Sequence, residues 1–527
     1  MKSKFFVRLV LWLVLATFLP PGLSSRTWQE EASALDRYIA TARQQWRIPG
    51  MAVAVVKDGK ILLARGYGIR KQGESGPVDA DTLFAIASNT KAFTAAALSM
   101  LTDEKRLQWS DPVQQHLPGF QLTDPWISAE IRVRDLLCHR SGLGTFSGDL
   151  LWYGTGYSGA EIVRRCRFLK SAFPFRSGYG YSNLMFIAAG EVIQAVSGQP
   201  WGQFLQQRIF TPLGMVRTNS SHAELLKDAN IAWPHYVFPD GRVVIHDLIS
   251  VDNAGAAAAI NSSVADMSRW LRMLLNKGVW EGRKILSPDA LEEMWAVQNP
   301  TRPSRRTREL FPSTHFSGYG LGWGLMDYRG SKVVSHSGAL DGMISQVMLV
   351  PEKNLGLVVL TNSINSLPRA LMFRVLDSFS GTAEKDWSAI FLKRSEEEFK
   401  SFMARVDWIN EKNRQPSGLT AAQLEEFAGL YECPLYGQAR VTVSGKGLKL
   451  NLIPAPMFQA DLTPLSPDVF MIRFDRFFSF IPHGIGVVQF SRDPRGKIVN
   501  LKIDVPNDDF DFGELNFSRV KEPDNKP

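Results

Sequence analysis

A serine and a lysine stand three positions apart at the start of an alanine-rich apolar stretch, "FAIASNTKAFTAAALSM", residues 84–100. On a helix, positions i and i+3 share a face, so this spacing would hold the amine of Lys91 against the hydroxyl of Ser88. A serine hydroxyl needs such a base at neutral pH, and burial lowers the pKa of a lysine. The backbone N–H of Ser88, at a helix start, could serve as an oxyanion donor. We therefore expect a nucleophile–base pair; the alternative is a lysine that snorkels to the surface.

A second candidate group is Tyr181-Ser182-Asn183, which stands just before an apolar stretch that we expect to form a helix ending at Gly198. A phenol between the serine and the leaving group could shuttle the proton, particularly if nearby cations lower its pKa. Asn183 could donate a hydrogen bond to a substrate carbonyl. The structural alternative is an aromatic loop packed on a helix, with Asn183 as the N-cap.

A third candidate group is His336-Ser337-Gly338, at the end of an apolar strand-like run. An edge strand beside the nucleophile could align a substrate through backbone hydrogen bonds, and Gly338 would let that backbone approach closely. The N–H of Ala339 would then be a second oxyanion donor. His336 could hold the polar end of the substrate; the alternative is a strand-end histidine bonded to backbone.

Taken together and in this order, the three groups resemble the motifs of the serine β-lactamase and penicillin-binding superfamily. The branch that the chain resembles most contains class C β-lactamases, D-alanyl-D-alanine carboxypeptidases and esterases. Three further stretches are similar to that branch: "IRVRDLLCHRSGL" at residues 131–143, "IFTPLGMVRT" at residues 209–218 and "YGLGWGL" at residues 319–325. The resemblance implies an acyl-enzyme on Ser88, with the site between a helical domain and an α/β sandwich. It also implies that no cofactor is needed.

One residue departs from the pattern of many β-lactamases and transpeptidases, which carry a lysine where this chain has His336. A histidine is largely neutral at pH 7, so it supplies no fixed charge for a substrate carboxylate. We therefore expect an esterase or D-amino-acid peptidase acting on a small molecule or short peptide, and rank a β-lactamase below it. A different class of function is an inactive protein that binds penicillin or peptidoglycan fragments. A rival catalytic dyad, His139 with Ser141, is interpreted as structural because its stretch recurs in the family without a catalytic role.

The elements that must position these residues follow from the hydrophobic pattern. Residues 50–68 read as a hairpin around an Asp-Gly turn, and strand-like runs return between residues 332 and 362. Helix-like stretches lie between them. This order indicates one sheet that contains both the first and the last strands of the region, with the helices packed on it. Composition changes to charged and helical near residue 384, and to short alternating runs after residue 416.

The expected fold class is therefore α+β: a β-lactamase/transpeptidase-like α/β sandwich plus a helical domain, followed by a small all-β barrel. The expected boundaries are 1–25 for a signal peptide, 26–383 for the hydrolase domain, 384–416 for a helical linker and 417–527 for the barrel. The tail from about Leu419 resembles a lipocalin-like module, and a lipid or small-ligand carrier is a third functional alternative.

Composition and simple motifs indicate the class of protein, its export, and its use of cysteines and metals. The 527 residues are 45% hydrophobic and 21% charged, which is typical of a globular enzyme, and the net charge of +8 does not indicate nucleic-acid binding. A basic start, an apolar run at residues 9–19 and small residues after it predict a secretory signal peptide and a periplasmic or secreted protein; an uncleaved anchor is the alternative. The three cysteines indicate no disulfide framework, and no metal motif occurs. Association with the cell envelope and the oligomeric state are left open.

Overall fold

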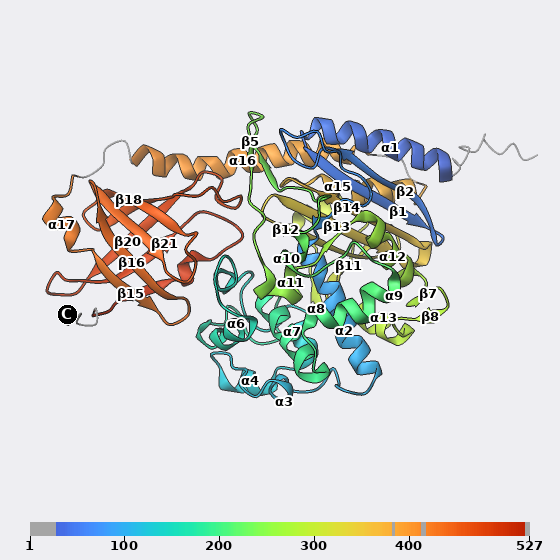
Figure 1. Ribbon diagram of the computed structural model, residues 1–527, viewed down its shortest axis with the longest axis horizontal. Coiled ribbons are helices and arrows are strands. Elements are labelled where there is room, and N and C mark those ends of the chain that lie inside the picture. Colours follow the sequence, from blue (N-terminus) through green and yellow to red (C-terminus); the bar gives the residue numbers. More distant parts are fainter. Residues whose placement is uncertain (1–27, 382–384, 413–417, 522–527) are drawn as a thin grey trace, which may run out of the picture.

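The computed structural model describes residues 28–381, 385–412 and 418–521. The predicted signal peptide, residues 1–25, lies outside the described residues. The chain forms two bodies, an N-terminal body of residues 28–381 and a β-barrel of residues 429–519, joined by a long helix (Figure 1). The predicted α+β architecture, a body of sheet and helices followed by an all-β barrel, is confirmed.

An eight-stranded antiparallel sheet forms the centre of the N-terminal body, in the order β2-β1-β14-β13-β12-β11-β10-β9. Its strands are β1 (Gly50–Lys57), β2 (Lys60–Gly68), β9 (Asn299–Thr301), β10 (Ser317–Tyr319), β11 (Gly324–Tyr328), β12 (Ser331–Leu340), β13 (Met343–Val350) and β14 (Leu355–Thr361). The β1–β2 hairpin turns at Asp58 and Gly59, both with positive φ, as a two-residue turn of this kind requires. Because β1 also pairs with β14, with Val53 opposite Val359, the two ends of this body meet in one sheet.

Helices cover both faces of the sheet, so its strands are buried on both sides. Along β1, Val53 and Val55 pack with helices α1 (Trp28–Gln45) and α15 (Leu367–Ser378), while Ala52 and Ala54 belong to the core on the opposite face. Helix α12 (Val264–Leu275) covers that opposite face at β1 and β14. The alternation follows from the two-residue period of a strand.

A helical layer beside the sheet contains α2 (Thr90–Asp103) and α7 (Asn183–Ser197), which pack on each other. Twelve of the fourteen residues of α2 are buried, which explains its small alanine side chains. The shorter helices of this body are α3 (Val113–His116), α4 (Pro125–Glu130), α5 (Val133–Leu136), α6 (Gly159–Arg165), α8 (Trp201–Leu205), α9 (Thr211–Leu213), α10 (His222–Leu225), α11 (Gly255–Ala258), α13 (Pro288–Met294) and α14 (Arg305–Leu310). Three small ribbons complete it: β3 (Phe84–Ala85) with β6 (Asn261–Ser262), β4 (His235–Val237) with β5 (Val243–Ile245), and β7 (Val279–Trp280) with β8 (Arg283–Lys284).

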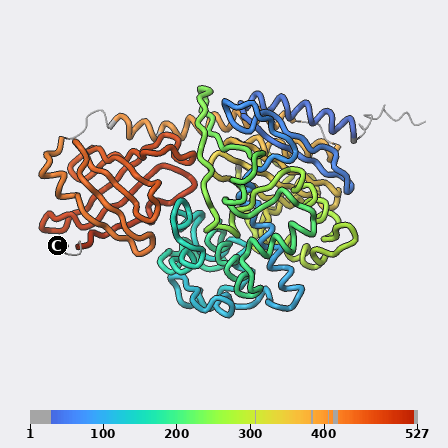
Figure 2. The backbone as a smooth tube through the Cα atoms, viewed as in Figure 1, coloured from blue at the N-terminus to red at the C-terminus, as the bar shows by residue number. Residues whose placement is uncertain are grey.

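Helix α16 (Trp387–Lys412) occupies most of the segment predicted as a helical linker, and it runs from the N-terminal body to the barrel (Figure 2). At its start, Trp387 Nε1 donates a hydrogen bond to Asp377 of α15 at 2.8 Å. Near its end, Val406 and Ile409 pack against Met471 and Ile485 of the barrel. The helix therefore ties the two bodies together rather than acting as a loose tether.

The C-terminal body is a closed barrel in which each strand pairs with its neighbours in sequence, and β22 pairs back to β15. A short helix, α17 (Ala421–Glu425), precedes it. The strands are β15 (Gly429–Cys433), β16 (Gly437–Ser444), β17 (Gly447–Leu452), β18 (Gln459–Ser466), β19 (Val469–Phe474), β20 (Ile485–Arg492), β21 (Ile498–Asp504) and β22 (Asn516–Arg519). Closure leaves no open edge among these strands. In the core, the buried ring of Phe470 packs on that of Phe490, and the ring of Phe458 packs on that of Phe478. Kinship with lipocalins stays a prediction.

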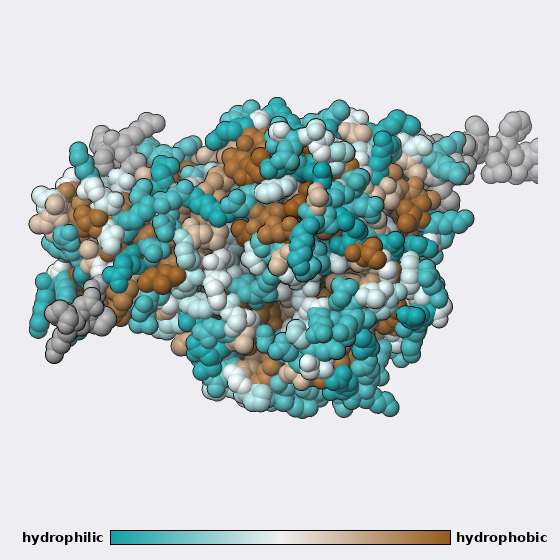
Figure 3. Space-filling view, in the orientation of Figure 1, coloured by the Kyte–Doolittle hydropathy of each residue, from teal (hydrophilic) through white to brown (hydrophobic). Residues whose placement is uncertain are grey.

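Hydrophilic and apolar residues alternate over the face drawn in Figure 3, with several apolar patches near its middle. Within the part of the chain that the structure describes, no helix combines the length and the apolar character needed to cross a bilayer. The three cysteines are free, buried thiols.

Candidate active site

Ser88 lies in a single 3₁₀ turn, Ala87–Asn89, directly before α2, and Lys91 lies in the first turn of that helix. Lys91 does not snorkel: it is 0% exposed, and its Nζ atom lies 3.0 Å from Ser88 Oγ. Ala87 has a φ of 46°, a conformation that costs energy for a residue with a side chain. The structure thus brings the expected serine and lysine together on a tightly constrained turn.

The amine of Lys91 has two further contacts, with Asn183 Oδ1 at 2.6 Å and with the carbonyl oxygen of Ala257 at 3.0 Å. Both partners only accept hydrogen bonds, whereas the Ser88 hydroxyl can also donate one. A neutral amine has two N–H groups and one lone pair. In this geometry the two N–H groups bond to Asn183 and Ala257, which leaves the lone pair for the proton of Ser88.

Burial lowers the pKa of Lys91 to about 7, and the carboxylate of Asp149 opposes this shift. Burial also raises the pKa of Asp149 to about 7. A lysine with a pKa near the working pH exchanges protons readily with a reacting group, which is the property that a general base needs.

Tyr181 lies over this pair, with Lys91 Nζ 4.8 Å from the centre of its ring. The sequence suggested that cations could lower the pKa of this phenol, but the structure indicates a raised pKa. Burial raises the pKa of Tyr181, and the hydrogen bond with Ser88 offsets only part of that shift. Tyr181 is therefore a neutral phenol that could pass a proton on rather than a phenolate base.

Asn183 is the first residue of α7, and the N-cap is Ser182, whose hydroxyl accepts a hydrogen bond from the Met185 amide. The alternative interpretation of Asn183 as the N-cap is therefore wrong. Its side-chain amide instead links Lys91 to Asp149, to which Asn183 Nδ2 donates at 2.5 Å. Asn183 also lines the cavity beside Ser88, and its expected contact with a substrate carbonyl stays a prediction.

The strand that carries His336, Ser337 and Gly338 is β12, which lies between β11 and β13 and so is not an edge strand as expected. Its pairing with β11, however, stops at Ser335, whereas its pairing with β13 continues to Leu340. The last five residues of β12 therefore form a local open edge among the described strands. This open edge is where the predicted backbone hydrogen bonds to a substrate could form.

Gly338 is the point where this edge meets the nucleophile. A Cβ atom at Gly338 would lie 2.2 Å from the Ile86 carbonyl oxygen and 2.9 Å from the Ser88 nitrogen, so only glycine fits. Ala339 follows directly and lines the same cavity as Ser88. The two predicted oxyanion donors, the N–H groups of Ser88 and Ala339, thus belong to segments in direct contact.

His336 is buried, and burial together with the nearby Lys91 lowers its pKa to about 3. Its Nδ1 atom lies 2.6 Å from the Ser337 carbonyl oxygen, which can only accept, so Nδ1 carries the proton. Its Nε2 atom then accepts a hydrogen bond from the Tyr319 hydroxyl at 2.7 Å. The imidazole is neutral and held in place, so it supplies no fixed charge to the site.

The rival pair His139 and Ser141 has structural contacts. His139 is buried, its Nδ1 atom accepts a hydrogen bond from the Ser182 amide at 3.1 Å, and its ring packs on Tyr181 with 4.2 Å between centres. Ser141 Oγ accepts from the Leu143 amide at 3.4 Å. The contacts of His139 hold the Tyr181–Asn183 segment in position, and the Ser141 contact is local, which fits the structural interpretation.

A cavity of about 250 Å³ opens at Ser88 and contains most of the predicted site. Its lining includes Ser88, Tyr181, Asn183, His336, Ser337 and Ala339. A larger hollow of about 720 Å³ shares Tyr181, His336 and Ser337 with the lining of this cavity. In the described residues, no cluster of His, Cys, Asp and Glu could hold a metal ion.

Sequence reasoning missed several residues of the site. Asp149 and Tyr319 partner the motif residues, and Asp341 lines the cavity. Phe480, Asp509 and Phe510 of the barrel line it too. Tyr319 stands in the quoted "YGLGWGL" stretch and could have been suspected, whereas no local signal marks the barrel residues, which lie about 400 positions after Ser88.

An antiparallel sheet under a helical layer, with a buried lysine against a serine at the start of the layer's inner helix, defines a β-lactamase type of fold and site. A sequence profile described as Beta-lactamase matches residues 35–375, and the chain belongs to this family of hydrolases. A second profile, described as Domain of unknown function (DUF3471), matches residues 413–519.

Two relatives and one solved structure are similar to this chain. The chain is 32% identical to "Unguisins hydrolase ungD'" of Aspergillus campestris, over 66% of each chain. It is 30% identical to "Unguisins hydrolase ungD" of Aspergillus violaceofuscus, over 79% of this chain and 77% of the relative. Its fold is similar to that of the octameric penicillin-binding protein homologue from Pyrococcus abyssi, with a TM-score of 0.60, 22% identity, and coverage of 92% of this chain and 99% of the other.

Proposed function

We propose that the protein is a serine hydrolase that forms an acyl-enzyme on Ser88. The observation that carries this proposal is the geometry around Lys91 Nζ, which bonds to two pure acceptors and has its remaining position directed at Ser88 Oγ, 3.0 Å away. A pKa of about 7 for Lys91 leaves a large fraction of the amine neutral at neutral pH.

In the proposed reaction, Ser88 Oγ attacks the carbonyl carbon of an ester or amide while its proton passes to Lys91. The N–H groups of Ser88 and Ala339 stabilise the oxyanion. The C–O or C–N bond of the substrate then breaks, and the leaving group takes a proton that Tyr181 relays from Lys91. Water then attacks the carbonyl carbon of the acyl-enzyme and gives a proton to Lys91. The bond between that carbon and Ser88 Oγ breaks, Ser88 takes back a proton, and the acyl group leaves as a carboxylic acid.

The substrate class that the site favours is an ester or a short peptide, as for an esterase or D-amino-acid peptidase. The neutral, hydrogen-bonded His336 offers no fixed charge to a substrate carboxylate, which argues against a true β-lactamase. An inactive binding protein would not need a buried lysine at hydrogen-bonding distance from a serine, and burying that amine is costly. Both relatives named above carry the word hydrolase in their names. Export through residues 1–25 is part of the proposal, with cell fractionation as its test.

A serine-reactive fluorophosphonate probe tests the proposal. We expect wild-type protein to be labelled, and Ser88→Ala to lose labelling with an unchanged thermal unfolding midpoint. Ser337→Ala is the matched control, because Ser337 lines the same cavity and has no assigned role as a nucleophile. Absence of labelling in folded wild-type protein, or labelling that survives Ser88→Ala, would contradict the proposal.

A further inference from the structure

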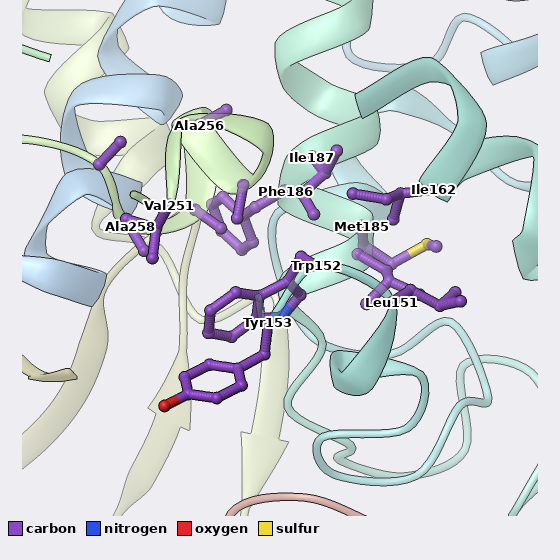
Figure 4. Packing of buried hydrophobic residues seen from close by; sticks show 14 of the residues in the cluster. Leu151, Trp152, Tyr153, Ile162, Met185, Phe186, Ile187, Val251, Ala256 and Ala258 are labelled. Atoms are coloured by element: carbon purple, nitrogen blue, oxygen red, sulfur yellow. The ribbon is translucent and has the colours of Figure 1, made fainter. Parts of the chain in front are cut away.

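Asp149 lies in a loop whose two ends are held by the N-terminal body. Before it, the Phe146 amide donates a hydrogen bond to the Tyr181 carbonyl oxygen at 2.8 Å. After it, Leu151 and Trp152 are buried, and Figure 4 shows both side chains beside the buried residues of α7. The part of the loop between these two anchors depends on other contacts.

Two polar groups in the middle of this loop are bonded to the barrel. Glu514 ends a 3₁₀ turn of the barrel, Phe512–Glu514. Its carboxylate accepts hydrogen bonds from the Ser147 hydroxyl and from the Gly148 amide, the latter at 2.7 Å and across 366 positions of the chain. Ser147 is buried and Glu514 is half-buried, so water has little access to these bonds. Hydrogen bonds to an ionised acceptor are among the strong ones in proteins. The barrel therefore holds the middle of the loop.

The backbone that these contacts hold is strained. Phe146 has a φ of 61°, in the left-handed region that is unfavourable for a bulky residue. Strain of this kind persists only where the surroundings over-determine the backbone. Here the Tyr181 carbonyl oxygen holds Phe146 itself, and Glu514 holds the two residues that follow it. Loss of the Glu514 carboxylate would let the backbone relax directly before Asp149.

Asp149 passes this constraint on to the proposed base. Its Oδ2 atom accepts a hydrogen bond from Asn183 Nδ2 at 2.5 Å, and Asn183 Oδ1 accepts one from Lys91 Nζ at 2.6 Å. The side-chain amide of Asn183 is thus held from both sides. A shift of the Asp149 carboxylate would let that amide turn, and the lone pair of Lys91 would no longer be directed at Ser88.

Resting on the proposed function, we propose that Glu514 of the barrel is a positioning residue for Lys91, and that it acts through the loop that carries Asp149. Glu514 is not among the residues that line the cavity at Ser88, so it acts on the chemical step and not on substrate binding. The barrel then has a part in catalysis, because it completes the support of the base.

Another contact between the two bodies provides a matched control. The Tyr157 hydroxyl donates a hydrogen bond to the carbonyl oxygen of Tyr436 in the barrel at 2.7 Å. This contact does not involve the segment from Phe146 to Asp149. Tyr157→Phe therefore removes a hydrogen bond between the bodies and leaves the contacts of the loop in place.

Burst kinetics with a nitrophenyl ester test the proposal. In Glu514→Ala we expect the saturating rate of acylation to fall about tenfold, while the ester concentration that gives half this rate stays within about twofold of wild type, since misplacement of a catalytic group slows the chemical step. Glu514→Gln should restore most of the rate, because the glutamine side chain can accept from the Gly148 amide and donate to the Ser147 hydroxyl. Tyr157→Phe should acylate at the wild-type rate.

A double-mutant cycle tests the path of action. In an Asp149→Ala background, Glu514→Ala should cause no further loss, because the residue through which it acts is gone. If Glu514→Ala does not fold, Ser147→Ala removes one of the same two bonds from the other side and replaces it in every comparison. A wild-type rate in Glu514→Ala, equal losses in Glu514→Ala and Glu514→Gln, an equal loss in Tyr157→Phe, or a full further loss in the Asp149→Ala background would overturn the proposal.

Failure of the proposed function looks different, because no ester would then be hydrolysed in a Ser88-dependent way. In that case hydrogen exchange measured by mass spectrometry decides whether Glu514 holds the loop. Residues 144–151 should exchange about fivefold faster in Glu514→Ala than in wild type, and at the wild-type rate in Tyr157→Phe. Unchanged exchange in Glu514→Ala would reject the inference.

Discussion

The Nζ atom of Lys91 lies 2.6 Å from the Oδ1 atom of Asn183, although 92 positions separate the two residues in the chain. This contact fixes the direction of the lysine amine, because Asn183 is held from its other side by Asp149. The orientation of the proposed base therefore depends on the α7 helix and on the turn Asp149–Leu151, not only on the segment that carries Ser88 and Lys91.

Lys91→Met should remove the proposed base while leaving a buried chain of similar length. We expect kcat/KM for a nitrophenyl ester to fall about 10³-fold, since general-base catalysis contributes factors of this size. The fold should be retained, because an apolar residue in this buried position avoids the cost of a buried amine. Burst-phase acylation kinetics measure the effect, and Lys170→Met, at an exposed position, is the control. Wild-type acylation in Lys91→Met would remove Lys91 from the mechanism.

The acylation rate should rise with pH and level off above about 7. Lys91 must be neutral to accept the proton of Ser88, and burial lowers its pKa to about 7, so the neutral fraction increases through that pH. His336 should add no step near its ordinary pKa, because burial and Lys91 hold its pKa at about 3. A pH profile of kcat/KM between pH 5 and 10.5 measures this limb. A limb near pH 10 would mean that Lys91 titrates as an exposed lysine does.

Asp149→Asn should move this acid limb to lower pH by about one unit. The carboxylate of Asp149 favours the protonated form of Lys91, so its removal lowers the pKa of the amine further. The asparagine carbonyl can still accept the hydrogen bond from Asn183. The pH profile of the variant is compared with that of Asp289→Asn, an exposed aspartate outside the cavity lining. An unmoved limb would show that Asp149 does not act on Lys91.

Gly338→Ala should reduce kcat/KM about 10²-fold or more, a loss comparable to that of one oxyanion donor. The new Cβ atom would overlap the Ile86 carbonyl oxygen and press on the Ser88 nitrogen, so β12 must move away from the nucleophile. Gly119→Ala is the matched control, since a Cβ atom there meets no atom within 4 Å. Ester hydrolysis and the thermal unfolding midpoint are measured together, and wild-type activity in Gly338→Ala would place the oxyanion site elsewhere.

Much of the site followed from local sequence because its motifs lie on regular elements. The spacing of Ser88 and Lys91 fixes their relative position once a helix forms, and the Asp58-Gly59 turn fixes the first hairpin. Contacts between distant segments did not follow in this way. The pKa of Tyr181 and the local open edge of β12 depend on what surrounds them, which no local pattern specifies.

The sequence alone determined which groups do chemistry and in what order they occur: a hydroxyl, an amine, a phenol and an imidazole on elements whose periodicity is visible in the letters. Only the tertiary structure decided that Lys91 is fully buried, that Asn183 joins it to Asp149, and that Asp509 of the barrel shares a cavity with Ser88. The physical reason is the distance along the chain between the residues that interact. Helix and turn geometry is set by neighbours a few residues apart, whereas burial, electrostatic coupling and cavity walls are set by segments that meet only when the whole chain has folded.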